Sequence, residues 1–147
     1  MESKDLILSE ITENVIGCAY RVSNTLGCGF LEKIYEKAMV LEIRKIGLKV
    51  KTQFPMTVRY DNEIIGEYVA DLFVEDVLLV ELKSVEALNK IHFAQCLNYL
   101  KATGLKTCLL INFGRTKVQI KRFNNYFEKK EQETAESIGT LIKMDKL

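Results

Sequence analysis

The sequence predicts an α/β domain in which helices flank a mixed central β-sheet. Apolar residues recur at helical spacing over 5–26 and 31–46, and then alternate with polar residues over 50–60. Two strongly apolar segments, 77–82 and 105–112, are separated by a further helical pattern. Such a crossover places two strands parallel in one sheet. The expected order is two helices, three strands, a helix and two strands.

Each predicted helix stops at a glycine. The first is followed by Gly27-Cys28-Gly29, and the second by Gly47, at the position after the last turn. The third helix is expected over 90–102 and ends at Thr103-Gly104. These breaks separate the helices from the segments with strand patterns.

Short turns separate the predicted strands. Pro55 cannot donate a ladder hydrogen bond, so 50–60 is expected to be an edge strand or two short pieces. Asp61-Asn62 and Glu75-Asp76 mark turns on either side of a strand over 64–74. The remaining strands are predicted over 77–82, 105–112 and 118–123, and the last two are joined by a turn over 113–115.

Length and composition fit one globular domain. The 147 residues are 48% hydrophobic and 28% charged, which is ordinary for a soluble protein with one core. There is no apolar run of membrane-spanning length and no signal-peptide layout at the start. We therefore expect a cytoplasmic protein without a membrane partner. Residues 1–124 would form the domain, and 125–147 a polar tail that could be helical.

The net charge leaves the kind of partner open, whereas the cysteine content argues against two kinds of site. The net charge of +1 neither requires nor excludes a nucleic-acid partner, because an enzyme that touches a few phosphates can be nearly neutral. The four cysteines form no CxxC pair, and only one histidine is present. A zinc site or a disulfide framework is therefore not expected, and buried free thiols are.

Three ionisable residues, Asp71, Glu81 and Lys83, interrupt the two apolar strands of the second hairpin. Residues two apart on a strand face the same side, so Glu81 and Lys83 project together. If the hairpin folds about its acidic turn, Asp71 falls opposite Val80 or Glu81 and can lie beside Glu81. Two adjacent carboxylates need a compensating charge, which a divalent cation and Lys83 would supply.

This arrangement favours a metal-dependent hydrolytic site. Oxygen ligands without histidine or thiolate suit Mg²⁺ or Mn²⁺, and such an ion polarises a phosphoryl oxygen and activates bound water. The structural alternative is a solvated strand face on which Glu81 and Lys83 pair with Asp71 across the strands. The apolar flanks favour the site, because they indicate strands buried on both faces, and α/β proteins place sites where such strands end.

Two motifs resemble those of a known group of enzymes. Asp71, nine intervening residues and then Glu81-Leu82-Lys83 resemble the signature of the PD-(D/E)XK nuclease superfamily, with Ala70 where some members have proline. The segment 29–36, GFLEKIYE, resembles the GxxExxY signature that names one family within it. Together the motifs and their context cover roughly residues 10–123.

The resemblance implies a restriction-endonuclease-like core and a set of site residues. Asp71 and Glu81 look like the metal-binding carboxylates, and the backbone carbonyl of Leu82 looks like a further ligand. Lys83 looks like the catalytic lysine. Glu32 looks like the extra acidic residue that members often project toward the metal.

More than one role can be assigned to three further side chains, those of Glu32, Gln95 and Tyr35. Glu32 lies in the first turn of its helix, where a carboxylate also favours the helix dipole and can act as a capping partner. Gln95 matches a polar position that some members use near the active site, but it could equally hydrogen-bond to a strand. Tyr35 is expected to be a packing residue whose hydroxyl bonds the site.

The function implied by the resemblance is hydrolysis of nucleic-acid phosphodiester bonds by metal-activated water. Mg²⁺ or Mn²⁺ would be the cofactor, and DNA, in preference to RNA, the partner. One alternative is a binding or assembly module that keeps the fold without chemistry, which the modest net charge favours. Another is a small-molecule phosphohydrolase. A domain of this size could act as a homodimer.

Overall fold

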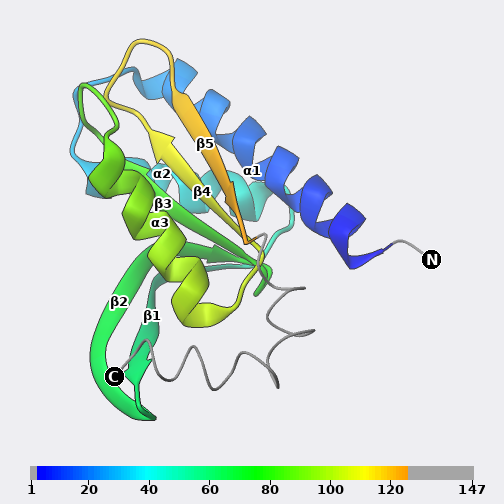
Figure 1. Ribbon diagram of the computed structural model, residues 1–147. Helices are drawn as coiled ribbons and strands as arrows, with labels where there is room; N and C mark the ends of the chain where they lie inside the picture. Colours follow the sequence, from blue (N-terminus) through cyan, green and yellow to red (C-terminus); the bar gives the residue numbers. More distant parts are fainter. Residues whose placement is uncertain (1–2, 126–147) are drawn as a thin grey trace.

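The computed structural model describes residues 3–125, which form a five-stranded sheet between helices (Figure 1). The expected tail, 125–147, lies outside the described residues except for Asn125. The helices and strands are α1 (Lys4–Leu26), α2 (Glu32–Lys45), β1 (Val50–Tyr60), β2 (Glu63–Val74), β3 (Leu78–Lys83), α3 (Lys90–Thr103), β4 (Thr107–Asn112) and β5 (Gln119–Asn124). This order confirms the predicted one.

The sheet is mixed, and its strands are neighbours in the order of the sequence. β1 pairs antiparallel with β2, β2 with β3, and β4 with β5, whereas β3 and β4 are parallel. The parallel pair is the one connected through α3, as the crossover argument predicts. β1 is at one edge of this sheet and is a single strand that contains Pro55, which is where a proline is tolerated.

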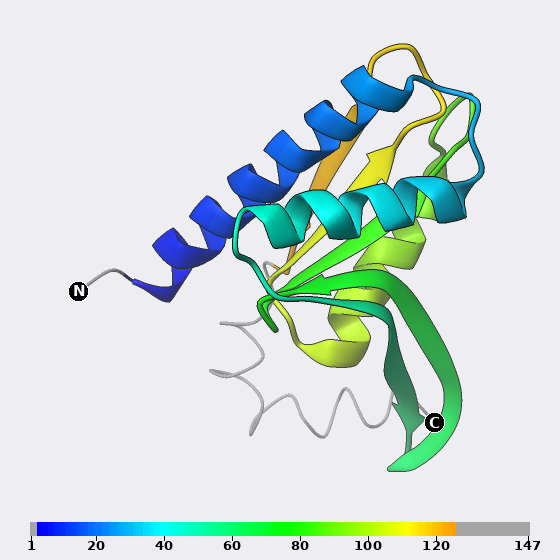
Figure 2. The same ribbon diagram turned by 180° about the vertical axis from the view of Figure 1, so that it is seen from behind.

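Helices cover both faces of the sheet (Figure 2). On one face, α1 and α2 pack against apolar side chains of β2, β3 and β4 that include Leu72 and Val80. On the other face, α3 packs against a second cluster that includes Ala70, Leu79 and Leu110. Successive residues of β3 therefore enter opposite cores, which is why its sequence is almost continuously apolar.

Both hairpin turns consist of two residues with a left-handed backbone. Asp61, Asn62, Glu75 and Asp76 all have positive φ angles, between 50° and 63°. Two consecutive left-handed residues give the turn that suits the twist of a β-hairpin, and Asn and Asp tolerate this conformation best. The predicted positions of both turns are thus confirmed.

In β1 and β2, side chains of successive residues point to opposite faces of the sheet, and this alternation is interrupted at one row, the pair of facing residues Gln53 and Asp71. Leu72 packs under α1 and α2, but Ala70, two residues earlier, packs under α3. The break in β2 is therefore at Asp71. In β1 the facing residue, Gln53, has a φ of 51° and is skipped in the pairing, although the register is unchanged on either side. The β1–β2 hairpin thus changes faces at this row.

Just beyond this row Ala70 and Met56 still pack under α3, and the rest of the hairpin leaves the body of the protein. Residues 63–69 of β2 are all exposed, whereas Leu72, Phe73 and Val74 are buried. Figure 1 shows this outer part of β1 and β2 curving away from the remaining strands. Within the described chain, no helix is both long and apolar enough to cross a membrane.

Candidate active site

The ladder between β2 and β3 stops one residue before the two carboxylates that the sequence singles out. Its last pair is Leu72 and Val80. At the next position, Oδ2 of Asp71 accepts a hydrogen bond from the backbone N–H of Leu82 at 2.8 Å, and Oε1 of Glu81 accepts one from the N–H of Asp71 at 3.3 Å. The carboxylates thus satisfy strand N–H groups that the diverging strands leave without a backbone partner.

Glu81 lies in a nearly dry environment. Only 4% of the residue is exposed. The Tyr99 hydroxyl is 3.2 Å from Oε2, and Nζ of Lys83 is 3.5 Å from the same oxygen. Burial, and next the charge of Asp71, raise the pKa of Glu81 to about 7, against the opposing effect of Lys83. A second positive charge at this point would relieve the repulsion between Asp71 and Glu81.

Lys83 is the last residue of β3, and its side chain is 17% exposed. Its backbone carbonyl accepts a hydrogen bond from Phe113. The loop that follows is held by Asn112, whose side chain accepts from the N–H of Val85 and donates to its carbonyl. A Cβ on Gly114 would lie 2.2 Å from the Val85 carbonyl oxygen, so this loop and the end of β3 are closely fitted together.

A third carboxylate, that of Glu36 on α2, is connected to the site through the side chain of Gln53. Nε2 of Gln53 donates to Oε1 of Glu36 at 2.8 Å and lies 3.5 Å from Oδ1 of Asp71. Glu36 is 5% exposed and forms an ion pair with Lys33 at 2.9 Å. The left-handed backbone of Gln53 is strained for a non-glycine residue. The strained residue is thus the one whose side-chain amide links Glu36 to Asp71.

The structure brings some of the predicted site residues together and leaves others apart. Asp71, Glu81, Lys83 and the backbone of Leu82 are adjacent. Glu32 is the exposed first residue of α2, and within residues 3–125 no hydrogen bond or ion pair joins it to Asp71 or Glu81.

The contacts of α3 and of Tyr35 are also defined. Gln95 is half-buried on α3, and the side chain that contacts Glu81 comes from Tyr99, one turn later. The hydroxyl of Tyr35 donates to the carbonyl of Gly27 at 2.6 Å and accepts from the N–H of Phe30. The expectation that this hydroxyl bonds the site is therefore wrong: it secures the loop before α2.

Sequence reasoning missed Gln53, Glu36 and Tyr99. Gln53 belongs to an alternating strand, in which a polar residue indicates only a side that faces solvent. Glu36 directly follows Tyr35 in the GxxExxY-like segment, and this position is the one signal in the sequence that points to it. Tyr99 has the spacing of a core residue, and its ring is indeed buried.

The donor set fits a hard divalent cation. Asp71 and Glu81 offer carboxylate oxygens, and the backbone carbonyl of Leu82 is a further oxygen donor of the kind that Mg²⁺ accepts. Within residues 3–125, no three or more His, Cys, Asp or Glu side chains form a group that could hold a metal ion. Mg²⁺ usually keeps several water molecules and binds through only one or two carboxylates, so the pair Asp71 and Glu81 is compatible with it.

Comparisons with known proteins identify the family and the fold of this chain. The sequence profile of the PD-(D/E)XK nuclease superfamily matches residues 9–123. No curated protein sequence matches the chain. Among solved structures, the crystal structure of SSO0001 is similar, with 17% identity, a TM-score of 0.51, and coverage of 90% of this chain and 67% of that one.

A second similar structure is an alkaline exonuclease (LHK-Exo) from Laribacter hongkongensis. It is 12% identical, has a TM-score of 0.46, and the match covers 86% of each chain. At 17% identity the likeness to SSO0001 concerns the fold alone. The family profile, by contrast, covers most of the chain, including both motifs. This chain belongs to the PD-(D/E)XK nuclease superfamily.

Proposed function

We propose that the protein is a Mg²⁺-dependent nuclease that hydrolyses phosphodiester bonds of nucleic acid, with DNA preferred to RNA and Mn²⁺ able to replace Mg²⁺. Membership of a nuclease superfamily supports the reaction class. The observation that carries the proposal is the pair of Asp71 and Glu81 at the break in the β2–β3 ladder, with Lys83 3.5 Å from Glu81.

The proposed roles follow from the contacts. Asp71, Glu81 and the carbonyl of Leu82 would hold the ion, which when bound polarises a phosphoryl oxygen and lowers the pKa of a bound water. The ammonium of Lys83 would orient that water or stabilise the negative charge that develops on the phosphoryl group. Lys83 is held for this role by its ion pair with Glu81.

Other side chains would position the two carboxylates. Tyr99 contacts Glu81 directly, and Gln53 links Asp71 to Glu36. Glu32, as a metal ligand, and Gln95, as a catalytic residue, belong to the proposal because of the family motif. Glu36 and Tyr99 belong to it because of their contacts. The motif at 29–36 also supports a place in the GxxExxY family. Homodimer formation and a cytoplasmic location remain predictions.

A cleavage assay with defined substrates tests the proposal. Single-stranded and duplex DNA and RNA of one sequence would be incubated with Mg²⁺, Mn²⁺ or EDTA, beside Asp71→Asn and Lys83→Ala. Cleavage by the wild type that needs the ion, favours DNA and is lost in both variants would support it. No cleavage of any substrate, together with no Mg²⁺ binding by calorimetry, would contradict it.

A second candidate is a nucleic-acid-binding module that keeps the nuclease fold. It is favoured by one observation: within the described residues, acidic side chains do not gather into a group of three around the pair. Oligonucleotide binding by the wild type without cleavage in either ion would identify this case. Retained cleavage in both variants would instead show that the site residues are wrongly assigned.

A further inference from the structure

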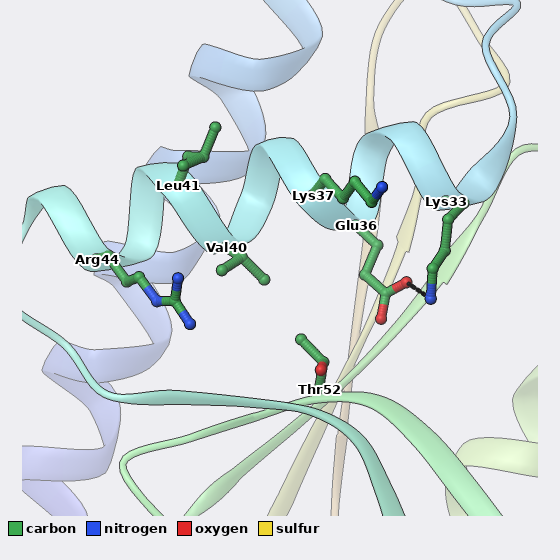
Figure 3. A pocket seen from close by; sticks show the side chains of 7 residues that line it. All are labelled: Lys33, Glu36, Lys37, Val40, Leu41, Arg44 and Thr52. Atoms are coloured by element: carbon green, nitrogen blue, oxygen red, sulfur yellow. Dashed lines mark ion pairs between the residues drawn. The ribbon is translucent and has the colours of Figure 1, made fainter.

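A pocket lies between α2 and β1, beside the proposed active site (Figure 3). Its volume is about 390 Å³, within the range typical of small-molecule sites. It is lined by Lys33, Glu36, Lys37, Val40, Leu41, Arg44 and Thr52. All but Thr52 come from α2, and Figure 3 shows Arg44, Val40, Glu36 and Lys33 directed toward the space above Thr52.

The lining is cationic with an apolar part. The lining contains three cationic side chains, those of Lys33, Lys37 and Arg44, and only one carboxylate, that of Glu36. Lysines 33 and 37 are four residues apart on α2, so they lie on one face of the helix. Lys33 is already paired with Glu36, but Lys37 and Arg44 are exposed and form no ion pair within residues 3–125. The pocket therefore has two cations available to an anionic ligand.

The pocket is joined to the active site by one side chain. Glu36 lines it and also accepts a hydrogen bond from Gln53, whose amide nitrogen lies 3.5 Å from Asp71. One end of the pocket is thus a single amide group away from the pair of carboxylates. The two regions have opposite charge: carboxylates dominate at Asp71 and Glu81, and cations dominate along α2.

We infer that this pocket binds the nucleotide next to the bond that is cleaved, with its phosphate on Lys37 and Arg44 and its sugar or base against Val40. The inference rests on the proposed function, because it takes Asp71 and Glu81 as the place of cleavage. A phosphodiester strand is repelled by the carboxylates but attracted by the pocket. Neutralising the adjacent phosphate on α2 would supply binding and alignment that the acidic pair cannot.

Equilibrium binding tests the inference without any cleavage. The affinity of a fluorescein-labelled single-stranded DNA dodecamer would be measured by anisotropy in EDTA, from 50 to 200 mM salt. For Lys37→Gln combined with Arg44→Gln, we expect binding about tenfold weaker and a salt slope lower by about 0.7 for each phosphate that the variant no longer neutralises. Both residues are exposed, so the fold should be retained, which thermal unfolding would verify.

A matched control separates the pocket from overall charge. Lys4→Gln combined with Arg59→Gln also removes one lysine and one arginine, but neither residue lines the pocket. This control should bind as the wild type does. Equal affinity and salt slope in the pocket and control variants would overturn the inference, as would a wild type that does not bind the dodecamer.

Cleavage of a small substrate distinguishes failure of the pocket from failure of the active site. Bis(4-nitrophenyl) phosphate is a phosphodiester without a neighbouring nucleotide. The pocket variant should have a lower kcat/KM than the wild type on the dodecamer and the same kcat/KM on this ester. Unchanged kcat/KM on both substrates would overturn the pocket and leave the nuclease proposal standing. If the pocket variant binds the dodecamer more weakly but the wild type cleaves neither substrate, the result would support the pocket and contradict the proposed nuclease activity.

Discussion

Oδ2 of Asp71 accepts a 2.8 Å hydrogen bond from the backbone N–H of Leu82, at the position where the β2–β3 ladder lacks its next pair. The carboxylate therefore has a structural role as well as its proposed chemical one. Asp71→Asn keeps an oxygen that can accept this bond but removes the charge. Asp71→Ala removes both, which separates the two roles.

We expect Asp71→Asn to change the free energy of unfolding by no more than about 1 kcal/mol, and Asp71→Ala to lower it by about 1–3 kcal/mol. Mg²⁺ affinity and cleavage should fall at least about 100-fold in both, because a ligand charge is lost. Urea unfolding and calorimetric titration with Mg²⁺ measure the two effects. Equal stability of the Asn and Ala variants would show that the hydrogen bond to Leu82 contributes nothing.

The raised pKa of Glu81 makes stability depend on pH in the metal-free protein. Its pKa is raised from 4.5 to about 7, first by burial and then by Asp71. Between these values the folded protein keeps a proton that the unfolded chain has lost. Stability from this group is therefore complete below about pH 4.5 and is lost as pH rises through about 7, a change of about 3 kcal/mol.

Urea unfolding at pH 5 and pH 8 measures this change. Glu81→Gln, which is neutral at both values, should remove most of it, whereas the exposed Glu67→Gln should leave it in place. Mg²⁺ competes with the proton, so its affinity should rise with pH up to about 7 in the wild type. A wild type that is equally stable at both values would contradict the assignment.

Tyr99→Phe should weaken the support of Glu81. The hydroxyl lies 3.2 Å from Oε2 of Glu81 and 3.1 Å from the carbonyl of Val69, and its single proton can serve one acceptor at a time. Its bond to the ionised carboxylate is the stronger one. The pKa of Glu81 should therefore be still higher in this variant. The free energy of unfolding at pH 8 should be lower by about 1–3 kcal/mol.

The pH dependence of kcat/KM measures this shift, because the rising limb should move to higher pH. A merely structural role for Tyr99 would lower stability without moving that limb. Asn98→Ala, on the same helix, is the comparison and should leave that limb in place, since Asn98 is half-buried but is not the α3 residue that contacts Glu81.

Gln53→Gly should affect stability and activity differently. Glycine adopts the positive φ of this position freely, which relieves strain of about 1 kcal/mol. The same change removes the amide that links Glu36 to Asp71, so cleavage should fall about tenfold. Thermal unfolding and kcat/KM test the two effects. Gln53→Ala should lose activity equally without the stabilisation, and full activity in both variants would show that the link is dispensable.

Glu36 and Glu32 offer a matched comparison, because they are carboxylates one turn apart on α2. Glu36→Gln should lower kcat/KM about tenfold, since it disturbs the contacts with Gln53 and Lys33. Glu32→Gln should have the smaller effect, because Glu32 is exposed at the start of the helix. The reverse order would assign the role to Glu32, as the family motif implies.

The fold could be predicted because its signals are local. Periods of 3.6 and 2 residues, glycine breaks and acidic turns each depend on a few neighbouring residues. The proximity of Asp71 and Glu81 followed from counting residues about the turn at Glu75-Asp76, since the register of a short hairpin depends on its turn.

The rest of the site depends on packing that no local pattern contains. Which turn of α3 lies over Glu81 is decided by how the helix sits on the sheet, so Tyr99 rather than Gln95 makes the contact. The same holds for α2, where Glu36 rather than Glu32 is linked to Asp71. The left-handed backbone of Gln53 has no signature in a polar residue of an alternating strand.

The change of faces at Gln53 and Asp71 has a consequence for hydrogen exchange. The outer hairpin has exposed residues from 63 to 69, whereas β3 and β4 are buried throughout except at Lys83. Amides of the outer hairpin should exchange by local opening, and those of β3 and β4 only on global unfolding. The boundary between slow and fast exchange should then lie beyond Ala70 and Met56, which are still buried under α3.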